Sequence, residues 1–213
     1  MARHFLFLIS ILIIIVACNA PVQDKSQDKS LTPPGEKKAP VQKERVAEEV
    51  NELLSNQNRV KSIYYKYKGP QTGDNFYDFY IKGSKLKYEP ALEIKTLDRE
   101  DSYDTIFIDK EAKTAASYCE AAYCAYKGKK ADLNYDDAYI STVFDWSNGL
   151  TSAKKIGEEI IDDRSTWKID SDKGILWIDT FYGIPLKVDS SGKVYRFQQI
   201  SVNSVQDADV APS

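Results

Sequence analysis

The segment at residues 174–202 constrains the architecture of this chain more than any other. Residues 174–188 form an apolar stretch, a turn and a second apolar stretch, and residues 193–202 form a third. The last two are separated by the turn Asp189-Ser190-Ser191-Gly192. Short apolar stretches bounded by Asp, Ser and Gly are typical of antiparallel strands. Because a small meander is stable only against an apolar surface, the rest of the chain is expected to supply that surface.

The segments before this meander predict an α+β domain. The first is an amphipathic helix at 43–58, with apolar residues at i, i+4, i+7 and i+8: Val46, Val50, Leu53 and Leu54. Short alternating segments then predict strands at 60–68, 75–82, 85–89, 103–109, 113–119, 124–127, 153–162 and 165–170. Of these eight segments and the three of the meander, about nine or ten are expected to pair as antiparallel strands.

Three further segments are less regular. Residues 128–148 predict a second helix, capped by Asp132 or Asn134 and ended by Asn148-Gly149. Residues 91–102 are expected to form a loop with a short strand around 92–94. The polar residues 203–213 are expected to form a loose tail.

The N-terminus reads as a targeting segment. Arg3 and His4 precede an apolar run over residues 5–17, which is short for a membrane-spanning helix and fits a signal peptide. The run ends in Ile15-Val16-Ala17-Cys18, which resembles the lipobox of prokaryotic lipoproteins. We therefore predict a lipoprotein signal peptide at 1–17 and lipid attachment at Cys18. An uncleaved anchor and an ordinary signal peptide with a chance cysteine are the alternatives.

Residues 18–42 predict a disordered tether. They lack aromatic residues, contain four prolines, and repeat Gln-Asp-Lys-Ser directly at 23–26 and 27–30. Low hydrophobicity and mixed charge cannot offset the entropy of ordering. A flexible chain of this length spans roughly 25–30 Å. The expected organisation is a folded domain at 43–206, a tail at 207–213, and an extracytoplasmic location at the outer membrane or cell surface.

Composition excludes several classes of function. The formal net charge is −3, so nucleic acid is not an expected partner. His4 is the only histidine and lies in the predicted signal peptide, so a mature chain has no Ser-His-Asp catalysis and no His-ligated zinc. Residues 132–143 begin like a calcium loop, but Asp137 replaces the glycine and Val143 the glutamate. We expect no enzyme activity, no metal and no cofactor.

Cys119 and Cys124 form an even pair once Cys18 is lipidated. Outside the cytoplasm, two cysteines across a tight hairpin predict a disulfide. A redox pair is the alternative, but such pairs normally have the spacing Cys-x-x-Cys at a helix start.

The order helix, strands, helix, strands resembles the lipoprotein-carrier (LolA/LolB-like) superfamily. The likeness is motif-like from Ile156-Gly157-Glu158-Glu159 onward, through Trp167-Lys168-Ile169-Asp170 to Tyr195-Arg196-Phe197 and Ile200. Its clearest part is the hairpin from Leu176-Trp177-Ile178-Asp179 to Gly183-Ile184-Pro185-Leu186-Lys187-Val188. The resemblance implies a strongly curved antiparallel sheet, a half-barrel, with helices over its concave side. Its members bind lipoprotein acyl chains or other lipids, or serve as envelope sensors.

The candidate ligand cavity is an aromatic lining of this sheet. We expect it to contain Tyr65, Tyr67, Phe79, Phe107, Trp167, Trp177 and Phe197, with Trp177 the residue of the hairpin that reaches the cavity. The alternative is an ordinary core, and a slip of one residue in strand register reverses every face.

The functional hypothesis is a membrane-anchored lipoprotein that binds or carries lipid or lipoprotein acyl chains. Its partners would be the membrane and a lipid or acylated-protein ligand. The alternative is a non-enzymatic envelope sensor or interaction module on the same fold, with a protein partner in the envelope. An enzyme is the third and least supported hypothesis.

Overall fold

A computed structural model describes residues 45–91 and 103–212 of the chain. These residues belong to one compact unit, Gln42–Ser213. The predicted signal peptide, the lipid-attachment residue Cys18, the tether and the strand around 92–94 lie outside the described residues.

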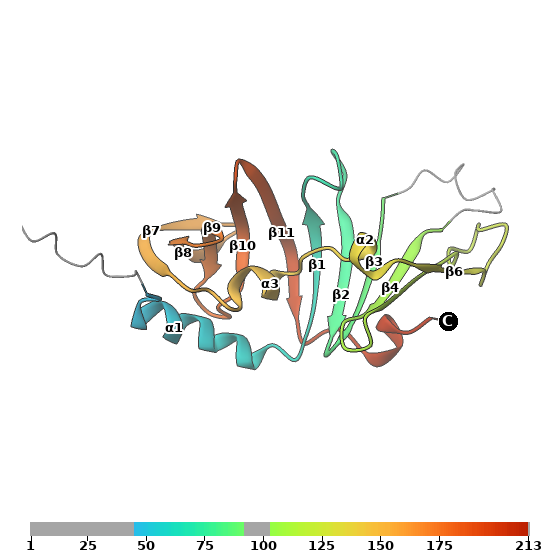
Figure 1. Cartoon of the computed structure of the whole chain (residues 1–213), viewed down its shortest axis with the longest axis horizontal. Helices are drawn as coiled ribbons and strands as arrows, with labels where there is room; N and C mark the ends of the chain where they lie inside the picture. Colours follow the sequence, from blue (N-terminus) through green and yellow to red (C-terminus); the bar gives the residue numbers. More distant parts are fainter. Residues whose placement is uncertain (1–44, 92–102, 213) are drawn as a thin grey trace, which may run out of the picture. The chain divides into compact units, whose positions relative to one another are not determined.

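The domain is built on one antiparallel sheet of eleven strands in the order β6-β5-β4-β3-β2-β1-β11-β10-β9-β8-β7 (Figure 1). The strands are β1 (Ser62–Lys68), β2 (Tyr77–Lys82), β3 (Lys85–Glu89), β4 (Thr105–Asp109), β5 (Thr114–Tyr118), β6 (Lys130–Leu133), β7 (Ala153–Ile161), β8 (Arg164–Ser171), β9 (Gly174–Asp179), β10 (Pro185–Ser190) and β11 (Lys193–Val202). The edge strands β6 and β7 do not pair with each other, so the sheet is not closed into a barrel. The predicted fold class, an α+β fold with a strongly curved antiparallel half-barrel sheet and helices over its concave side, is confirmed.

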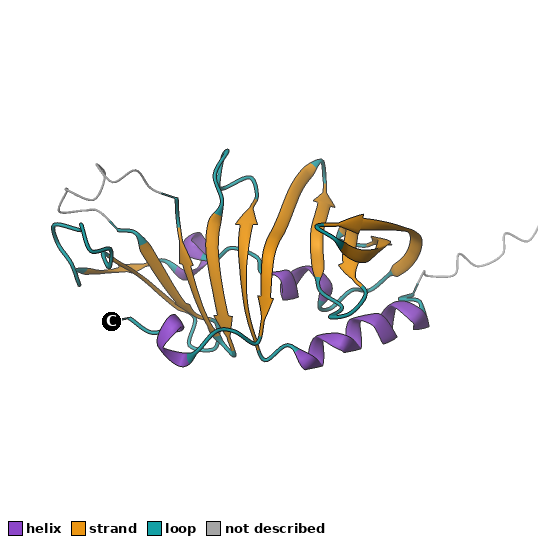
Figure 2. Ribbon diagram, turned by 180° about the vertical axis from the view of Figure 1, so that it is seen from behind, coloured by secondary structure: helices purple, strands orange, loops and turns teal. Residues whose placement is uncertain are grey.

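The helices are short. They are α1 (Glu48–Ser55), α2 (Tyr135–Ala138) and α3 (Val143–Ser147), with 3-10 turns at η1 (Asn56–Arg59) and η3 (Asp207–Val210). Figure 1 shows α2 and α3 in front of the strands, and Figure 2 shows the same strands from behind. No helix in the described part of the chain is both long and apolar enough to cross a membrane.

The first helix is shorter than its sequence pattern predicts. It begins at Glu48, because Val46 forms an isolated parallel bridge with Ala153 and the amide of Ala47 donates to the Ala153 carbonyl at 2.9 Å. Val50 and Leu53 of the predicted stripe are buried. The residues before Glu48 therefore pair with the start of β7 instead of extending the helix.

The sheet has two faces that differ in character. One contains Ile63, Tyr65 and Tyr67 of β1, all fully buried, and α2 and α3 lie over it; we call this the covered face. The other contains Tyr64 and Lys66 of the same strand, and we call it the open face. The alternation read from the sequence of residues 60–68 is therefore confirmed in β1.

Residues 124–148 differ most from the sequence prediction. Residues 124–127 are not a strand: the Cys119 carbonyl accepts from the Gly128 amide at 2.8 Å, which places the return of the chain later, in β6. The single helix predicted at 128–148 is instead β6, α2 and α3. Asn134 caps α2 through hydrogen bonds to the amides of Asp136 and Asp137, as expected of a capping residue.

The C-terminal residues are not a loose tail. Val205 and Val210 are 3% and 4% exposed, and η3 packs against β2 and β3. The prediction of a loose tail came from the polar residues of this segment, but burial of its two valines holds it against the domain.

Candidate functional site: the aromatic layer and its covering strap

Most of the predicted cavity residues lie on the covered face and pack against one another. Tyr65, Tyr67, Phe79 and Phe197 are all fully buried. The ring centroids of Tyr65 and Phe79 are 5.3 Å apart and nearly parallel, and those of Tyr65 and Phe197 are 5.4 Å apart and perpendicular. These are favourable aromatic geometries. We call these four side chains the aromatic layer.

Two predicted cavity residues, Phe107 and Trp177, lie on the open face, so this part of the prediction is wrong. Phe107 pairs with Lys87, and the next pair along these strands, Tyr88 with Ile106, lies on the covered face. Trp177 pairs with Lys168 and Lys187, whereas its neighbour Ile178 pairs with Trp167. Because side chains alternate along a strand, neither Phe107 nor Trp177 can share a lining with Tyr65.

Trp167, the seventh predicted residue, lies on the covered face near its β7 end. The Lys155 ammonium group lies over its ring, 3.9 Å from the centroid. Trp167 is partly exposed and sits away from the four rings of the aromatic layer in the sheet order.

A strap of residues 134–150 covers the aromatic layer. It contains α2 and α3 and crosses in front of the central strands in Figure 1. Three apolar residues of the strap are buried: Val143 is fully buried, and Ala138 and Ile140 are 8% and 7% exposed. The hydroxyl of Tyr88 donates to the Ala138 carbonyl at 3.0 Å. The strap has no long helical stripe, but five more of its apolar side chains pack against the core: Tyr135, Tyr139, Phe144, Trp146 and Leu150.

Asp145 is the polar centre of the strap. Its carboxylate accepts from the Tyr139 hydroxyl at 2.6 Å, the Thr142 amide at 2.7 Å and the Lys110 ammonium at 3.1 Å. Burial opposes ionisation, but the hydrogen bonds from Tyr139 and Thr142 and the charge of Lys110 outweigh it and hold the pKa of Asp145 below its usual 3.8. The pair Thr142 and Asp145 also forms the capping box that starts α3.

Two side chains from outside the strap tie down its C-terminal half. The Lys173 ammonium donates to the carbonyls of Asp145 at 2.6 Å and Asn148 at 2.5 Å. The Gln57 amide donates to the Ser147 hydroxyl at 2.8 Å and to the Gly183 carbonyl at 2.6 Å. The C-terminal end of the strap is therefore held by these polar contacts together with apolar ones: Phe144, Trp146 and Leu150 pack against the core, and the Trp146 ring lies 4.6 Å from that of Tyr195.

Two buried polar groups lie unpaired where the strap meets the sheet. Within the described residues, neither the Tyr65 hydroxyl nor the Trp146 Nε1 has a hydrogen-bond partner. The backbone of Val143 lies beside the Tyr65 hydroxyl but outside good hydrogen-bond geometry. Each buried unpaired group costs about 1–3 kcal/mol, so packing the strap over these two groups lowers the free energy of unfolding.

Replacing Asp145 should loosen the strap. We expect Asp145→Ala to lower the free energy of unfolding by about 2–3 kcal/mol, because it leaves Tyr139, Thr142 and Lys110 without their acceptor. Asp136→Ala, an exposed residue of α2, should cost less than about 0.5 kcal/mol. Urea unfolding of both variants measures the difference.

The effect of Asp145→Ala should depend on pH. The pKa of Asp145 is lower in the folded state, so its stabilisation is present above the usual pKa of 3.8 and is lost as pH falls through the folded-state pKa. The stability gap between the wild type and the variant should therefore narrow in acid. If the difference in free energy of unfolding between the wild type and the variant stays constant down to the lowest pH at which both are folded, the role assigned to this carboxylate is contradicted.

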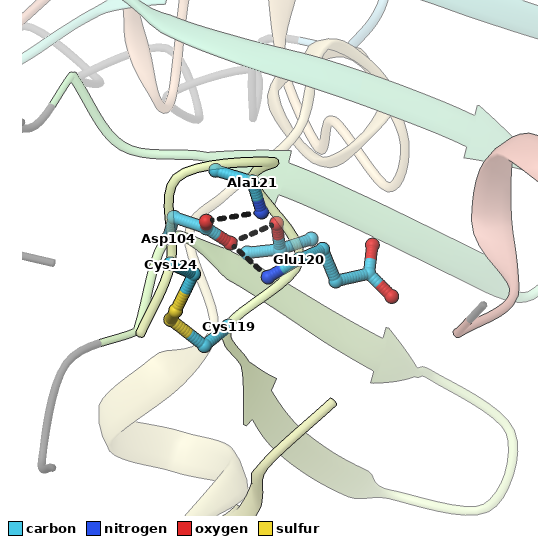
Figure 3. The surroundings of a disulfide bond; sticks show 6 residues. Asp104, Cys119, Glu120, Ala121 and Cys124 are labelled. Carbon is cyan, nitrogen blue, oxygen red and sulfur yellow. Dashed lines mark hydrogen bonds between the residues drawn. A yellow bond between two sulfur atoms is a disulfide. The ribbon is translucent and has the colours of Figure 1, made fainter. Parts of the chain in front are cut away.

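The loop that joins β5 to β6 is closed by the predicted disulfide. Cys119 and Cys124 are bonded, with Cα atoms 6.0 Å apart (Figure 3). The Asp104 carboxylate accepts from the amides of Glu120 at 2.9 Å and Ala121 at 2.7 Å. The loop is thus fixed by a covalent bond and by a carboxylate, and its two cysteines pack with Ala121 in a small cluster of their own.

Sequence reasoning missed the strap and its anchors. The signal for α3 was present as Thr142-x-x-Asp145, a capping-box spacing with Asp in place of Glu. Nothing in the sequence around Lys173 or Gln57 indicates that either reaches the strap. The described residues contain no group of three or more His, Cys, Asp or Glu side chains placed to hold a metal ion.

Comparison with known proteins gives structural likenesses only. No family model matches the sequence, and no curated protein matches it. The fold is similar to MucB (12% identity, 78% of this chain and 62% of that chain, TM-score 0.42) and to the Mycobacterium tuberculosis lipoprotein LppX (13% identity, 76% and 96%, TM-score 0.44). It is also similar to the Pseudomonas aeruginosa MucA/MucB complex structure (12% identity, 78% and 60%, TM-score 0.42).

The chain spans about 62% of the length of the MucB chain that it matches. Likeness at this level concerns the arrangement of strands and helices and says nothing about a ligand. Membership of the LolA/LolB-like superfamily therefore stays a prediction.

Proposed function

We propose that this chain is an extracytoplasmic protein, anchored to a membrane through Cys18, that binds acyl chains between the aromatic layer and the strap. The observation that carries the proposal is the interface beneath the strap, where aromatic rings, the Tyr65 hydroxyl and the Trp146 indole meet a covering of two short helices. The strap meets this apolar surface through both polar and apolar contacts, and an apolar ligand that occupies the same surface can replace the apolar ones and displace it.

Two further features support the cellular setting of this proposal. The lipobox-like Ile15-Val16-Ala17-Cys18 supports lipid anchoring. The disulfide between Cys119 and Cys124 supports an oxidising compartment outside the cytoplasm. We also propose that the protein acts by binding alone, since His4 is its only histidine and would be lost with the signal peptide.

Native mass spectrometry of the full chain, expressed in a bacterium and extracted from membranes in mild detergent, tests the proposal. We expect a mature N-terminus at Cys18 with a lipid anchor, and a second population that carries one additional lipid. Detection of only the anchored protein, with no lipid adduct under any extraction condition, would overturn acyl-chain binding while leaving the anchor intact.

A matched pair of variants sharpens this test. Asp145→Ala leaves Tyr139, Thr142 and Lys110 without their acceptor and loosens the closed strap, so the lipid-bound fraction should rise severalfold. Asp136→Ala changes an exposed residue of α2 and should leave lipid occupancy unchanged. Equal occupancy in the two variants would count against opening of the strap.

A protein-interaction module is the second candidate function, and the edge strand β7 favours it. Beyond the bridge from Val46 to Ala153 at its start, β7 pairs only with β8, and Ile156 and Ile160 are 48% and 73% exposed along it. An edge strand with exposed apolar side chains can accept a strand from a partner protein. A photo-crosslinking residue at Ile160 should then capture an envelope protein, whereas the same residue at exposed Val194 of β11 should not.

A further inference from the structure

Five residues from five adjacent strands form one line across the open face. In the order of the sheet from β8 to β1, the pairing register sets them side by side: Lys168, Trp177, Lys187, Arg196 and Lys68. Neighbouring strands lie about 4.8 Å apart, so the line follows the sheet for about 19 Å. We call these five residues the basic row.

The basic row sets like charges against each other. Lys187 lies directly opposite Arg196, and Arg196 directly opposite Lys68. Like charges in directly opposed positions destabilise a sheet. None of the four cations of the row forms an ion pair within the described residues, although Lys68 donates to the Asp74 carbonyl at 3.1 Å. An anionic ligand would relieve this repulsion.

Trp177 positions the two lysines that flank it. The ammonium group of Lys187 lies 4.0 Å from the centre of its ring and that of Lys168 lies 5.1 Å from it. The ring is only 6% exposed, and its Nε1 donates to the Glu159 carboxylate at 2.6 Å. A buried indole with a fixed hydrogen bond holds both cations in place.

The basic row borders a pocket of about 270 Å³. The pocket lies between the turn that joins β7 to β8 and the strands β10 and β11, and its polar lining comes from Glu159, Asp162, Lys187, Arg196 and Gln198. The Glu159 carboxylate already accepts from Trp177, and Asp162 is an exposed turn residue. Lys187, Arg196 and the Gln198 amide therefore remain as the hydrogen-bond donors.

We propose that this pocket binds a phosphate group. Arg196 offers a planar set of N–H donors that matches the oxygens of phosphate, and Lys187 adds a second positive charge beside it. Lys168 and Lys68 extend the positive surface to either side. The phosphate group is carried by a soluble ester or by a lipid headgroup, which present the same anion. The site lies on the opposite face of the sheet from the aromatic layer and does not depend on acyl-chain binding.

Calorimetric titration of the processed full chain, held in phosphatidylcholine nanodiscs, with glycerol 3-phosphate tests the proposal. The double variant Lys187→Gln/Arg196→Gln should bind about tenfold more weakly or worse, because it removes both charged donors. It should also melt at a higher temperature, because the like-charge pairs are gone. The melting measurement shows in addition that the variant is folded.

The matched control is Lys85→Gln/Lys130→Gln, which removes the same charge from exposed positions on β3 and β6. It should change the affinity less than about twofold, since distant surface charges are screened by salt. Equal loss of affinity in the two double variants would overturn a specific site. Absence of saturable binding by the wild type would overturn it as well.

The phosphate of phosphatidylcholine is neutralised by its own choline cation, so nanodiscs that also contain the anionic phosphatidylglycerol distinguish the two sources of an anionic phosphate. Weaker binding of glycerol 3-phosphate in these discs indicates that the lipid headgroup occupies the site, and unchanged binding indicates a soluble ester. Either result supports the site. Asp145→Ala should bind glycerol 3-phosphate like the wild type, so failure of the acyl-chain proposal leaves this one standing.

Discussion

Phe79→Ala should lower the free energy of unfolding by about 3–5 kcal/mol, the largest effect we expect from a single substitution. The Phe79 ring stacks on Tyr65 at 5.3 Å and on Tyr88 at 5.2 Å, and it touches Tyr67 at 5.2 Å. It is fully buried at the centre of the covered face. Truncation removes these contacts and leaves a cavity that neighbouring strands cannot fill. Urea unfolding of the full chain measures the loss.

This substitution also tests whether the covered face is packed or hollow. A ring that lines an existing cavity has partners on one side only, so its removal costs less than removal from a packed core. A loss of about 1 kcal/mol or less would contradict the packed aromatic layer. Phe181→Ala is the control: its ring is 61% exposed, and its loss should cost less than about 1 kcal/mol.

Gly183→Ala should lower the free energy of unfolding by about 3–4 kcal/mol. Gly183 has φ +68°, and a Cβ atom there would lie 2.4 Å from the backbone oxygen of Leu53 in α1. The left-handed conformation alone costs an L-residue about 1–2 kcal/mol. Overlap with backbone adds a similar amount, because α1 or the β9–β10 turn must move. Thermal and urea unfolding both report the change.

Gly192→Ala is a matched control for this prediction. Gly192 also has a positive φ, +75°, but a Cβ atom there would meet no heavy atom within 4 Å. It should therefore cost about 1–2 kcal/mol, the conformational part alone. If the two variants are equally stable, the contact between the hairpin and α1 does not constrain the fold.

The Gly183 turn shows why the hairpin motif has its particular residues. The Asp179 carboxylate accepts from the amides of Phe181 at 3.0 Å and Tyr182 at 2.6 Å, and it pairs with Arg164 at 3.4 Å. Asp179 is 3% exposed, so these bonds and the ion pair compensate its burial. Asp179, the acidic residue of the hairpin motif that carries the family resemblance, therefore has a structural role: it closes the turn between β9 and β10.

The two faces of the sheet lead to two separate proposals. The covered face has an aromatic layer under a strap with unpaired polar groups, and the open face has a row of cations beside a pocket. Because side chains alternate along each strand, adjacent residues such as Leu176 and Trp177 belong to different faces. A variant on one face can therefore be designed without altering the other.

Much of the sheet could be predicted from the sequence. Alternation placed Tyr65, Tyr67 and Phe79 on one face. The predicted strands 75–82 and 85–89 leave two residues between them, Gly83-Ser84, and this short turn pairs Lys82 with Lys85. These predictions succeed because hydrophobic period and turn chemistry are local properties. The prediction of a disulfide succeeded for a similar reason, since the cysteines are close in sequence.

The strap and the C-terminal segment could not be predicted in this way. α2 has four residues and α3 five, too few for a periodic stripe, so tertiary contacts and caps decide where they form. The burial of Val205 and Val210 depends on strands more than a hundred residues earlier in the chain. The pairing of Lys173 with the strap is likewise a long-range contact.

The amino-acid sequence by itself determined antiparallel strands, a first amphipathic helix, the disulfide and a lipobox-like N-terminus, because each depends on neighbours along the chain; that the sheet is open was implied only by the family resemblance. Only the tertiary structure decided which side of the sheet each aromatic residue occupies. Phe107 and Trp177 are aromatic strand residues like Phe79 and Phe197 of the covered face. The pairing of β4 with β3 and of β9 with β8 nevertheless places them on the open face. Register is a property of paired strands, so a single strand read alone does not contain it.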